Sequence, residues 1–123
     1  MNVPELEKIL SEIKSNIPDV ESAAIISSDG LVLVSTFSQS AQYDESRVGA
    51  MVSALLSLGN RASVELSRGN LEQVLVRGAK GYVVIESASE DAVLAVATNS
   101  NAKLGIIFHE LKRMKDRIVI TLA

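Results

Sequence analysis

Apolar residues recur at helical spacing in the first part of the chain, between Pro4 and about Asn16. Neighbouring apolar positions there lie mostly three or four residues apart, and they are Leu6, Ile9, Leu10, Ile13 and Ile17. This spacing places them on one face and predicts an amphipathic helix. Pro4 suits the first turn of that helix, and Pro18 ends it because proline has no amide to donate to the preceding turn.

A longer helical pattern runs from Asp44 to about Ser67. Asp44 is the expected N-cap, because its carboxylate can accept hydrogen bonds from the free amides of the first turn. The residues after this stretch, Gly69 and Asn70, are of the kinds that end helices. The pattern therefore predicts a single long helix in the middle of the chain.

A third helix is predicted from about Ala102 to Arg117, with Ser100 or Asn101 as its cap. Its expected buried stripe consists of Leu104, Ile107, Phe108, Leu111 and either Met114 or Lys115. The apolar tail that follows, residues 118–122, fits two interpretations. It is either a short added strand or an apolar cover for an edge of the sheet.

Five stretches rich in Val, Ile, Leu and Ala predict strands. They are Val20–Ser27, Leu31–Thr36, Leu71–Arg77, Tyr82–Glu86 and Ala92–Thr98. Asp29-Gly30, between the first two, is a strong hairpin signal because glycine accepts a positive φ. Residues 78–81 and 88–91 are too few for a parallel crossover, which needs about a dozen residues, so these neighbours should be antiparallel. Residues 37–42 are expected to form a polar loop.

The order of elements is therefore α-β-β-α-β-β-β-α, which places the chain in the α+β class. A five-stranded antiparallel sheet with helices packed on it is the economical arrangement. With 123 residues the chain is expected to be one domain, 1–123.

The long helix has no charged residue between Val48 and Asn60. One stripe is expected to cover the sheet, and it consists of Val48, Met51, Val52, Leu55, Leu58, Gly59, Ala62 and Leu66. The opposite side is expected to carry Gly49, Ser53, Ser57 and Asn60, flanked by Ala50, Ala54 and Leu56. Small residues four apart lie above one another and let another backbone come close.

A helix that is apolar or small on every side is normally covered on two sides. The pattern therefore predicts a second copy of the chain against this helix, in a symmetric dimer that buries about 1,200–2,000 Å² in total. The alternative is a solvated helix rich in Ser and Ala, because such residues are tolerated at a surface.

Composition removes several classes of function. The net charge of −3 opposes non-specific nucleic-acid binding, which needs a basic surface. The chain has no cysteine, so disulfides, thiolate metal sites and cysteine nucleophiles are excluded. No apolar run reaches the roughly 18 residues of a membrane span, and the charged N-terminal stretch is no signal peptide, so no membrane insertion and a cytoplasmic location are expected.

Candidate catalytic chemistry is sparse. His109 is the single histidine and is expected in solvent, and one histidine without cysteine cannot build an ordinary zinc site. Gly78-Ala79-Lys80-Gly81 lacks the spacing and the following helix of a phosphate-binding loop, so a hairpin turn is expected. The neighbouring acids at 19 and 21 and at 90 and 91 are expected to be solvated. No catalytic, metal or cofactor-binding residues are predicted, and no cofactor.

Basic residues gather near the predicted end of the last helix. They are Lys112, Arg113, Lys115 and Arg117. Cations at that position complement the helix dipole, which is the simplest interpretation. Contact between Lys112, Arg113 and Lys115 and an acidic partner or anionic surface is the alternative.

Taken in order, several of these pieces resemble the roadblock family, which includes dynein light chains of that name and bacterial gliding-motility regulators. The pieces are Asp29-Gly30 with the strand Leu31-Val32-Leu33-Val34, the long Ala/Ser/Leu helix, the strand Tyr82-Val83-Val84-Ile85, and Ala92-Val93-Leu94-Ala95-Val96-Ala97 leading to Leu104-Gly105. The resemblance covers nearly the whole chain. It rests on the order and spacing of the pieces together.

The resemblance implies a three-layer α-β-α sandwich of the roadblock and profilin-like kind. It implies a homodimer through the long helix and the strand after it, which adds Leu71, Gln73 and Leu75 to the interface. It also implies a non-catalytic regulator that binds a small Ras-like GTPase and modulates its nucleotide cycle or location.

Two alternatives to the GTPase partner are kept. One is a dimeric scaffold or adaptor subunit of a cytoskeletal or membrane-associated complex. The other is a ligand-sensing domain of profilin or PAS-like shape. Nucleotide-dependent retention of a GTPase, retention of large complexes regardless of nucleotide, and a bound metabolite would respectively favour the three classes.

Overall fold

The structure is a computed structural model and describes residues 2–37 and 43–123. Its elements are α1 (Val3–Asn16), β1 (Val20–Ser27), β2 (Val32–Ser35), α2 (Glu45–Glu65), β3 (Gln73–Gly78), β4 (Gly81–Ser87), β5 (Ala92–Thr98) and α3 (Leu104–Leu122). The predicted order of elements is confirmed. The bounds of β1 and β5 are those predicted from the sequence.

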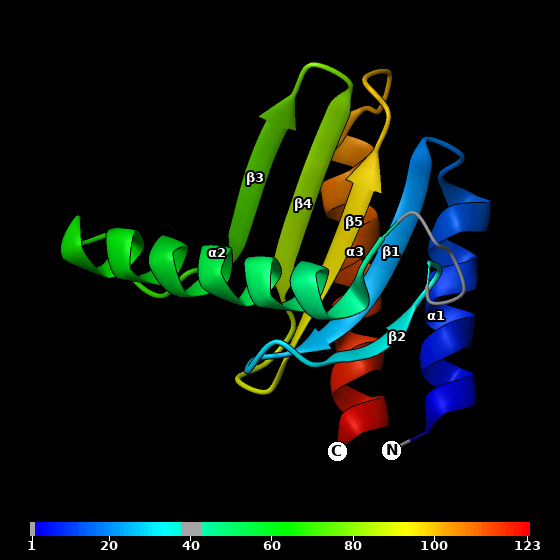
Figure 1. The fold of residues 1–123 in the computed structure, drawn as a ribbon, viewed down its shortest axis with the longest axis horizontal. Helices are drawn as coiled ribbons and strands as arrows, with labels where there is room; N and C mark the ends of the chain where they lie inside the picture. Colours follow the sequence, from blue (N-terminus) through cyan, green and yellow to red (C-terminus); the bar gives the residue numbers. More distant parts are fainter. Residues whose placement is uncertain (1, 38–42) are drawn as a thin grey trace.

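The five strands form one antiparallel sheet in the order β2-β1-β5-β4-β3. Helices α1 and α3 cover one face, and α2 crosses the strands on the other face (Figure 1). The predicted three-layer α-β-α sandwich is thus confirmed. β2 and β3 are the two edges of the sheet.

Two apolar clusters hold the layers together, one on each face of the sheet. The cluster beneath α1 and α3 is the larger, and its fully buried members include Leu6, Ile13, Ile25, Leu94 and Ile107. The cluster beneath α2 is smaller and includes Ala24, Ile26, Val52, Ile85 and Val93. Consecutive residues such as Ile25 and Ile26 enter opposite clusters, as expected when side chains alternate along a strand.

Of the two helix caps predicted from the sequence, one is confirmed and one is wrong. The Asp44 carboxylate accepts from the Arg47 amide at 3.3 Å, so the predicted N-cap of α2 is confirmed. Asn2 caps α1 in the same way. The predicted cap of α3 is wrong, because Lys103 occupies that position and its side chain makes no capping bond.

The apolar tail is neither a strand nor an edge cover, because α3 continues without a break to Leu122. Ile118 extends the buried series of Ile107, Leu111 and Met114 by one further helical turn. Burial of this residue outweighs the strand preference of the β-branched run around it.

The predicted polar loop is only partly described, since residues 38–42 lie outside the described part of the chain. Its first residue, Phe37, is buried in the cluster beneath α2. The Phe37 and Tyr43 rings meet edge to face with centroids 5.4 Å apart. Phe37 therefore belongs to the core, and its assignment to a polar loop was wrong.

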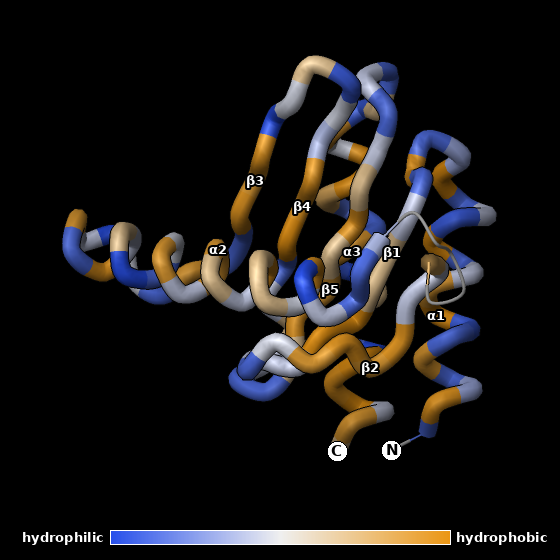
Figure 2. Tube along the Cα trace, viewed as in Figure 1, coloured by the Kyte–Doolittle hydropathy of each residue, from blue (hydrophilic) through white to orange (hydrophobic). Residues whose placement is uncertain are grey.

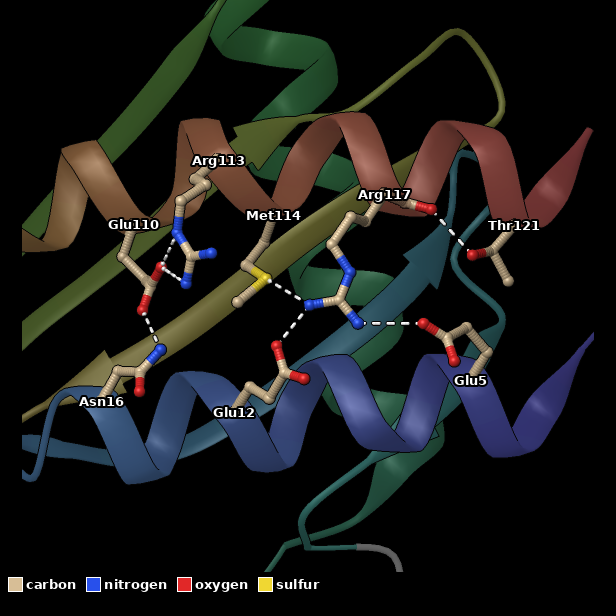
Figure 3. A network of polar contacts seen from close by, with 8 residues as sticks. All are labelled: Glu5, Glu12, Asn16, Glu110, Arg113, Met114, Arg117 and Thr121. Atoms are coloured by element: carbon tan, nitrogen blue, oxygen red, sulfur yellow. Dashed lines mark hydrogen bonds and ion pairs between the residues drawn. The ribbon is translucent and has the colours of Figure 1, made fainter.

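Polar contacts join α1 to α3 along their shared side (Figure 3). The Arg117 guanidinium donates to Glu5 at 2.9 Å and also to Glu12. Nearer the start of α3, the buried Glu110 carboxylate accepts from Asn16 at 2.8 Å and from Arg113 at 2.7 Å. One arginine thus serves two carboxylates of α1, and Glu110 holds the other end of the helix pair.

We predict that Arg117→Gln destabilises the fold near neutral pH and that this difference disappears in acid. The hydrogen bond from Arg117 lowers the pKa of Glu12 from its usual 4.5. A depressed carboxyl pKa stabilises the fold above the unfolded-state value, and this contribution is lost as pH falls through the folded-state pKa. Thermal melts of both proteins from pH 7 to pH 3 should therefore converge below pH 4.5.

Arg61→Gln is the matched control, because Arg61 pairs with Glu65 on an exposed part of α2. Exposed pairs of this kind contribute little. Equal losses in the two variants at pH 7, or a difference for Arg117→Gln that persists at pH 3, would contradict the assigned role of Arg117.

Candidate protein interface

Helix α2 is longer than the sheet is wide at its level, so its C-terminal end extends past β3 (Figure 1). At Gly59 the helix is still in contact with the sheet layer, through Leu71 and Val74. Residues 60–66 continue beyond it, and we call them the overhang. Apolar and polar residues alternate along this part of α2, whereas the middle of β3 is apolar (Figure 2).

The N-terminal half of α2 lies unusually close to the β1–β2 turn. A Cβ on Gly49 would stand 2.1 Å from the Gly30 carbonyl oxygen, so only glycine fits there. Gly30 itself has φ +94°, which glycine adopts without strain. The Ser53 hydroxyl donates to the Ser28 carbonyl at 3.0 Å. Two backbones therefore meet at this point, and the contact sets the rotation of α2 about its axis.

Further along the same face, polar side chains hold the turn that leads from α2 to β3. The Asn60 side-chain oxygen accepts from the Leu71 amide at 2.9 Å. The Ser63 hydroxyl donates to the Gly69 carbonyl at 2.7 Å. These two hydrogen bonds fix the overhang to the turn that leads into β3.

This rotation differs from the sequence prediction. Gly49, Ser53 and Asn60, assigned to a partner, instead contact the chain's own turns, and Leu56 packs on the sheet. Ala50, Ala54 and Ser57 are exposed in the single chain, and their place in an interface stays a prediction.

The stripe expected to cover the sheet is largely in solvent. Met51 and Leu58 are 52% and 68% exposed, and Leu55, Ala62 and Leu66 are also exposed. Only Val48, Val52 and Gly59 face inward as predicted. The prediction failed because periodicity alone does not show that Gly49 and Ser53 face the β1–β2 turn, and this rotation turns Met51 and Leu58 outward.

An apolar groove of about 440 Å³ runs between the exposed flank of α2 and the sheet. Its helix side is lined by Val48, Met51, Val52 and Leu55, and its sheet side includes Val76, Val83, Ala95 and Ala97. Apolar surface of this extent on one side of a monomer typically marks an interaction site.

The outer edge of β3 adjoins this groove and pairs with no other strand of the described chain. Leu75 and Val76 on it are partly exposed, on opposite faces. Leu71 and Gln73, the other β-strand residues predicted for the interface, are half-buried, and the Gln73 amide donates to Glu86 at 3.0 Å. The structure therefore brings the free edge, the overhang and the groove together on one side of the molecule.

The residues considered for catalysis or metal binding lie apart in residues 2–37 and 43–123. Within them, no cluster of three or more His, Cys, Asp or Glu is placed to hold a metal ion. His109 is exposed, and residues 78–81 form a tight β3–β4 hairpin, so both of these predictions are confirmed. Asp19 was expected in solvent but is half-buried and accepts from Asn99 at 3.0 Å. None of the described helices has the length and apolar character to cross a bilayer.

The basic residues of α3 separate into two groups. Arg113 is paired with Glu110 at 2.7 Å and Arg117 with α1, so neither is available as a simple cation. Lys112 is exposed and Lys115 half-exposed. Because α3 continues to Leu122, these residues lie in mid-helix, and the helix-dipole interpretation was wrong.

The model of the Roadblock/LC7 domain family matches residues 5–98. This match spans all five strands and both helices α1 and α2. The chain belongs to the Roadblock/LC7 family. The matched segment runs from within α1 to the end of β5, and α3 follows it.

This Roadblock/LC7 chain is similar to another protein in sequence and to solved structures in fold. It is 31% identical over 113 residues to the uncharacterized protein MJ0310 of Methanocaldococcus jannaschii, covering 92% of this chain and 96% of that one. The Roadblock/LC7 domain from Streptomyces avermitilis has a TM-score of 0.82 at 24% identity, with 94% and 95% coverage. Myxococcus xanthus MglB has a TM-score of 0.86 at 13% identity, with 99% and 92% coverage. These two structures share the fold.

We predict that Gly49→Ala destabilises this Roadblock/LC7 domain by about 1–3 kcal/mol, the usual cost of overpacking. The added methyl would meet backbone rather than a flexible side chain. Denaturant unfolding monitored by circular dichroism measures the loss.

Gly105→Ala is the control, because a Cβ on Gly105 meets nothing within 4 Å. Alanine is also the better helix former, so this variant should lose no stability. If both variants unfold at the wild-type midpoint, the Gly49–Gly30 contact does not constrain α2.

Proposed function

We propose that the chain forms a symmetric homodimer through β3 and the exposed flank of α2, and that this dimer regulates a small Ras-like GTPase without catalysis of its own. The observation that carries the dimer is the overhang, which has no sheet of its own beneath it. The apolar groove beside α2 is an uncovered sheet surface of matching character.

A two-fold axis beside β3 would place a second copy of the chain against both the overhang and the groove. The two β3 edges pair, which joins the sheets into one of ten strands and removes an open edge. Each overhang then lies over the sheet of the other copy. At 1.5 Å per residue its seven residues span about 10 Å, which is roughly two strand spacings. That reach extends from β3 onto β4 of the partner copy, where the groove begins.

Side-chain chemistry agrees with this arrangement. Val64 and Leu66 of the overhang are exposed and apolar, as are Met51 and Leu58 before it. Burial of such side chains is the usual driving force of association, at about 25 cal/mol per Å² of apolar surface. The contact differs from the predicted small-residue face, because the larger apolar residues of α2 meet the partner.

The GTPase assignment rests on family membership and on the resemblance to regulators of Ras-like gliding-motility GTPases. The described residues offer a docking surface and a dimer edge but gather no catalytic groups, which suits a regulator whose partner performs the chemistry. Speeding of hydrolysis and control of location are both compatible with this role. A dimeric scaffold subunit is the alternative.

We predict that Leu58→Asp weakens the dimer by roughly 100-fold, because a buried, unpaired carboxylate costs several kcal/mol. Sedimentation equilibrium at micromolar concentration measures the change. Leu31→Asp is the matched control, since Leu31 is 65% exposed against 68% for Leu58 but lies at the β1–β2 turn.

The control should remain dimeric, and circular dichroism should show both variants folded. An intact dimer in Leu58→Asp would exclude this flank of α2 as the interface. A wild-type chain that is monomeric at micromolar concentration would exclude the dimer itself.

We predict that the immobilised dimer retains a small Ras-like GTPase from its own cell extract in one nucleotide state. Extracts are supplemented with GDP or with a non-hydrolysable GTP analogue, and the retained proteins are identified by mass spectrometry. Retention should differ at least tenfold between the two, because the switch loops of such GTPases change with the γ-phosphate.

Leu58→Asp, if monomeric, should lose this retention, which ties the partner to the dimer. Retention of a large complex in equal amounts with either nucleotide would favour the scaffold function. A metabolite that co-purifies in the apolar groove would favour the ligand-sensing class.

A further inference from the structure

One strip of the sheet has no helix over it on the α1 and α3 face. There α1 packs on β1 and β2, and α3 packs on β4 and β5, so β3 is left beside them. Gln73, Leu75 and Arg77 point to this face, because their partners on β4 include Val84 and Tyr82 of the α1 and α3 cluster. Leu75 is 43% exposed here.

The flank of α3 that borders this strip is the one opposite Arg117 and α1. Helical spacing places Phe108, Lys112, Lys115 and Val119 on it. Phe108 packs half-buried against the core cluster, and Val119 is partly exposed. The strip therefore has an apolar floor at Leu75 and an apolar lower wall at Phe108.

The accessible charge of the strip is positive, in a chain whose net charge is −3. Its cations are Arg77, Lys112 and Lys115, and none of them takes part in an ion pair within the described residues. Glu86 lies at the floor but is 1% exposed and accepts from Gln73. Asp116 lies one turn from Lys112, towards the outer side of α3.

In the proposed dimer the two strips adjoin across the two-fold axis and form one trough between two α3 helices. Because α3 contacts both β4 and β5, its axis lies about two strand spacings from the dimer axis. At about 4.8 Å per spacing, the two α3 axes are roughly 19 Å apart. Helices pack at 8–10 Å, so this width admits a single helix between them.

We propose that this trough binds one amphipathic helix of a partner protein, with its apolar face on Leu75 and Phe108 and acidic residues along both edges. The proposal rests on the dimer of the preceding subsection. The acidic edges meet Lys112 and Lys115 of both copies. A lipid surface fits less well, because the floor lies about one helix diameter, roughly 10 Å, below the crests of α3 and a flat bilayer does not reach it.

A fluorescein-labelled peptide of 18 residues tests the proposal, with leucines at helical spacing and glutamates on both flanks. Fluorescence anisotropy at 0.1 M salt measures its binding to the full-length chain, and titration at high concentration measures stoichiometry. We expect one peptide per two chains. The same peptide with lysine in place of glutamate should bind at least tenfold more weakly.

Lys112→Glu/Lys115→Glu should weaken binding of the acidic peptide at least tenfold and leave the dimer intact in sedimentation. Lys8→Glu/Lys14→Glu makes the same charge change on exposed positions of α1 and should shift binding less than twofold. Leu75→Glu, which adds a negative charge to the floor, should also weaken binding tenfold.

Several results would overturn the trough while leaving the dimer standing. They are a dimer that binds neither peptide, two peptides per dimer, equal binding of the acidic and basic peptides, or no loss in Lys112→Glu/Lys115→Glu. Equal binding of the wild type and this variant to vesicles of phosphatidylserine and phosphatidylcholine, without peptide binding, would also overturn it. A monomer in the same sedimentation run would instead overturn the proposed function itself.

Discussion

The close contact between Gly49 and Gly30 determines how the second face of the sheet is used. Two backbones meet there without side chains between them, so α2 can take only one rotation about its axis. That rotation turns Gly49 and Ser53 towards the β1–β2 turn and leaves Met51, Leu55 and Leu58 facing outward. The exposed flank and the groove follow from this one approach distance, whereas the overhang follows from the length of α2.

Much of the fold could be predicted from the sequence because its signals are local. The strands Val20–Ser27 and Ala92–Thr98 are bounded by turn residues, and their predicted ranges are those observed. The Asp44 cap is a contact within one helical turn. The antiparallel pairing of β3, β4 and β5 then followed from connections too short for parallel crossovers.

The errors concern contacts between residues distant in the sequence. The rotation of α2 depends on Gly30, nineteen positions before Gly49, and periodicity along α2 does not contain that information. The last turn of α3 depends on a place in the core for Ile118. The outward position of Leu58 had a signal in retrospect, since the apolar residues of α2 are too many for one side of a helix to cover.

The two edge strands of the sheet differ in length and in the regularity of their pairing. β2 is four residues long, and its pairing with β1 shifts register between Ile25 and Ile26. Short and irregular edges are poor templates for further strands. β3 is longer and regularly paired with β4 along its length. β3 is therefore the better template for a further strand.

The turn between α2 and β3 makes the overhang a fixed projection. Asn60 and Ser63 bind that turn from within the helix, so the projecting helix end and the strand edge keep one relative position. A surface that is already arranged before its counterpart arrives loses little conformational entropy on association. Association through this end of the molecule, in the dimer proposed above, would therefore be rigid docking, with affinity set by side-chain fit rather than by the folding of a mobile segment.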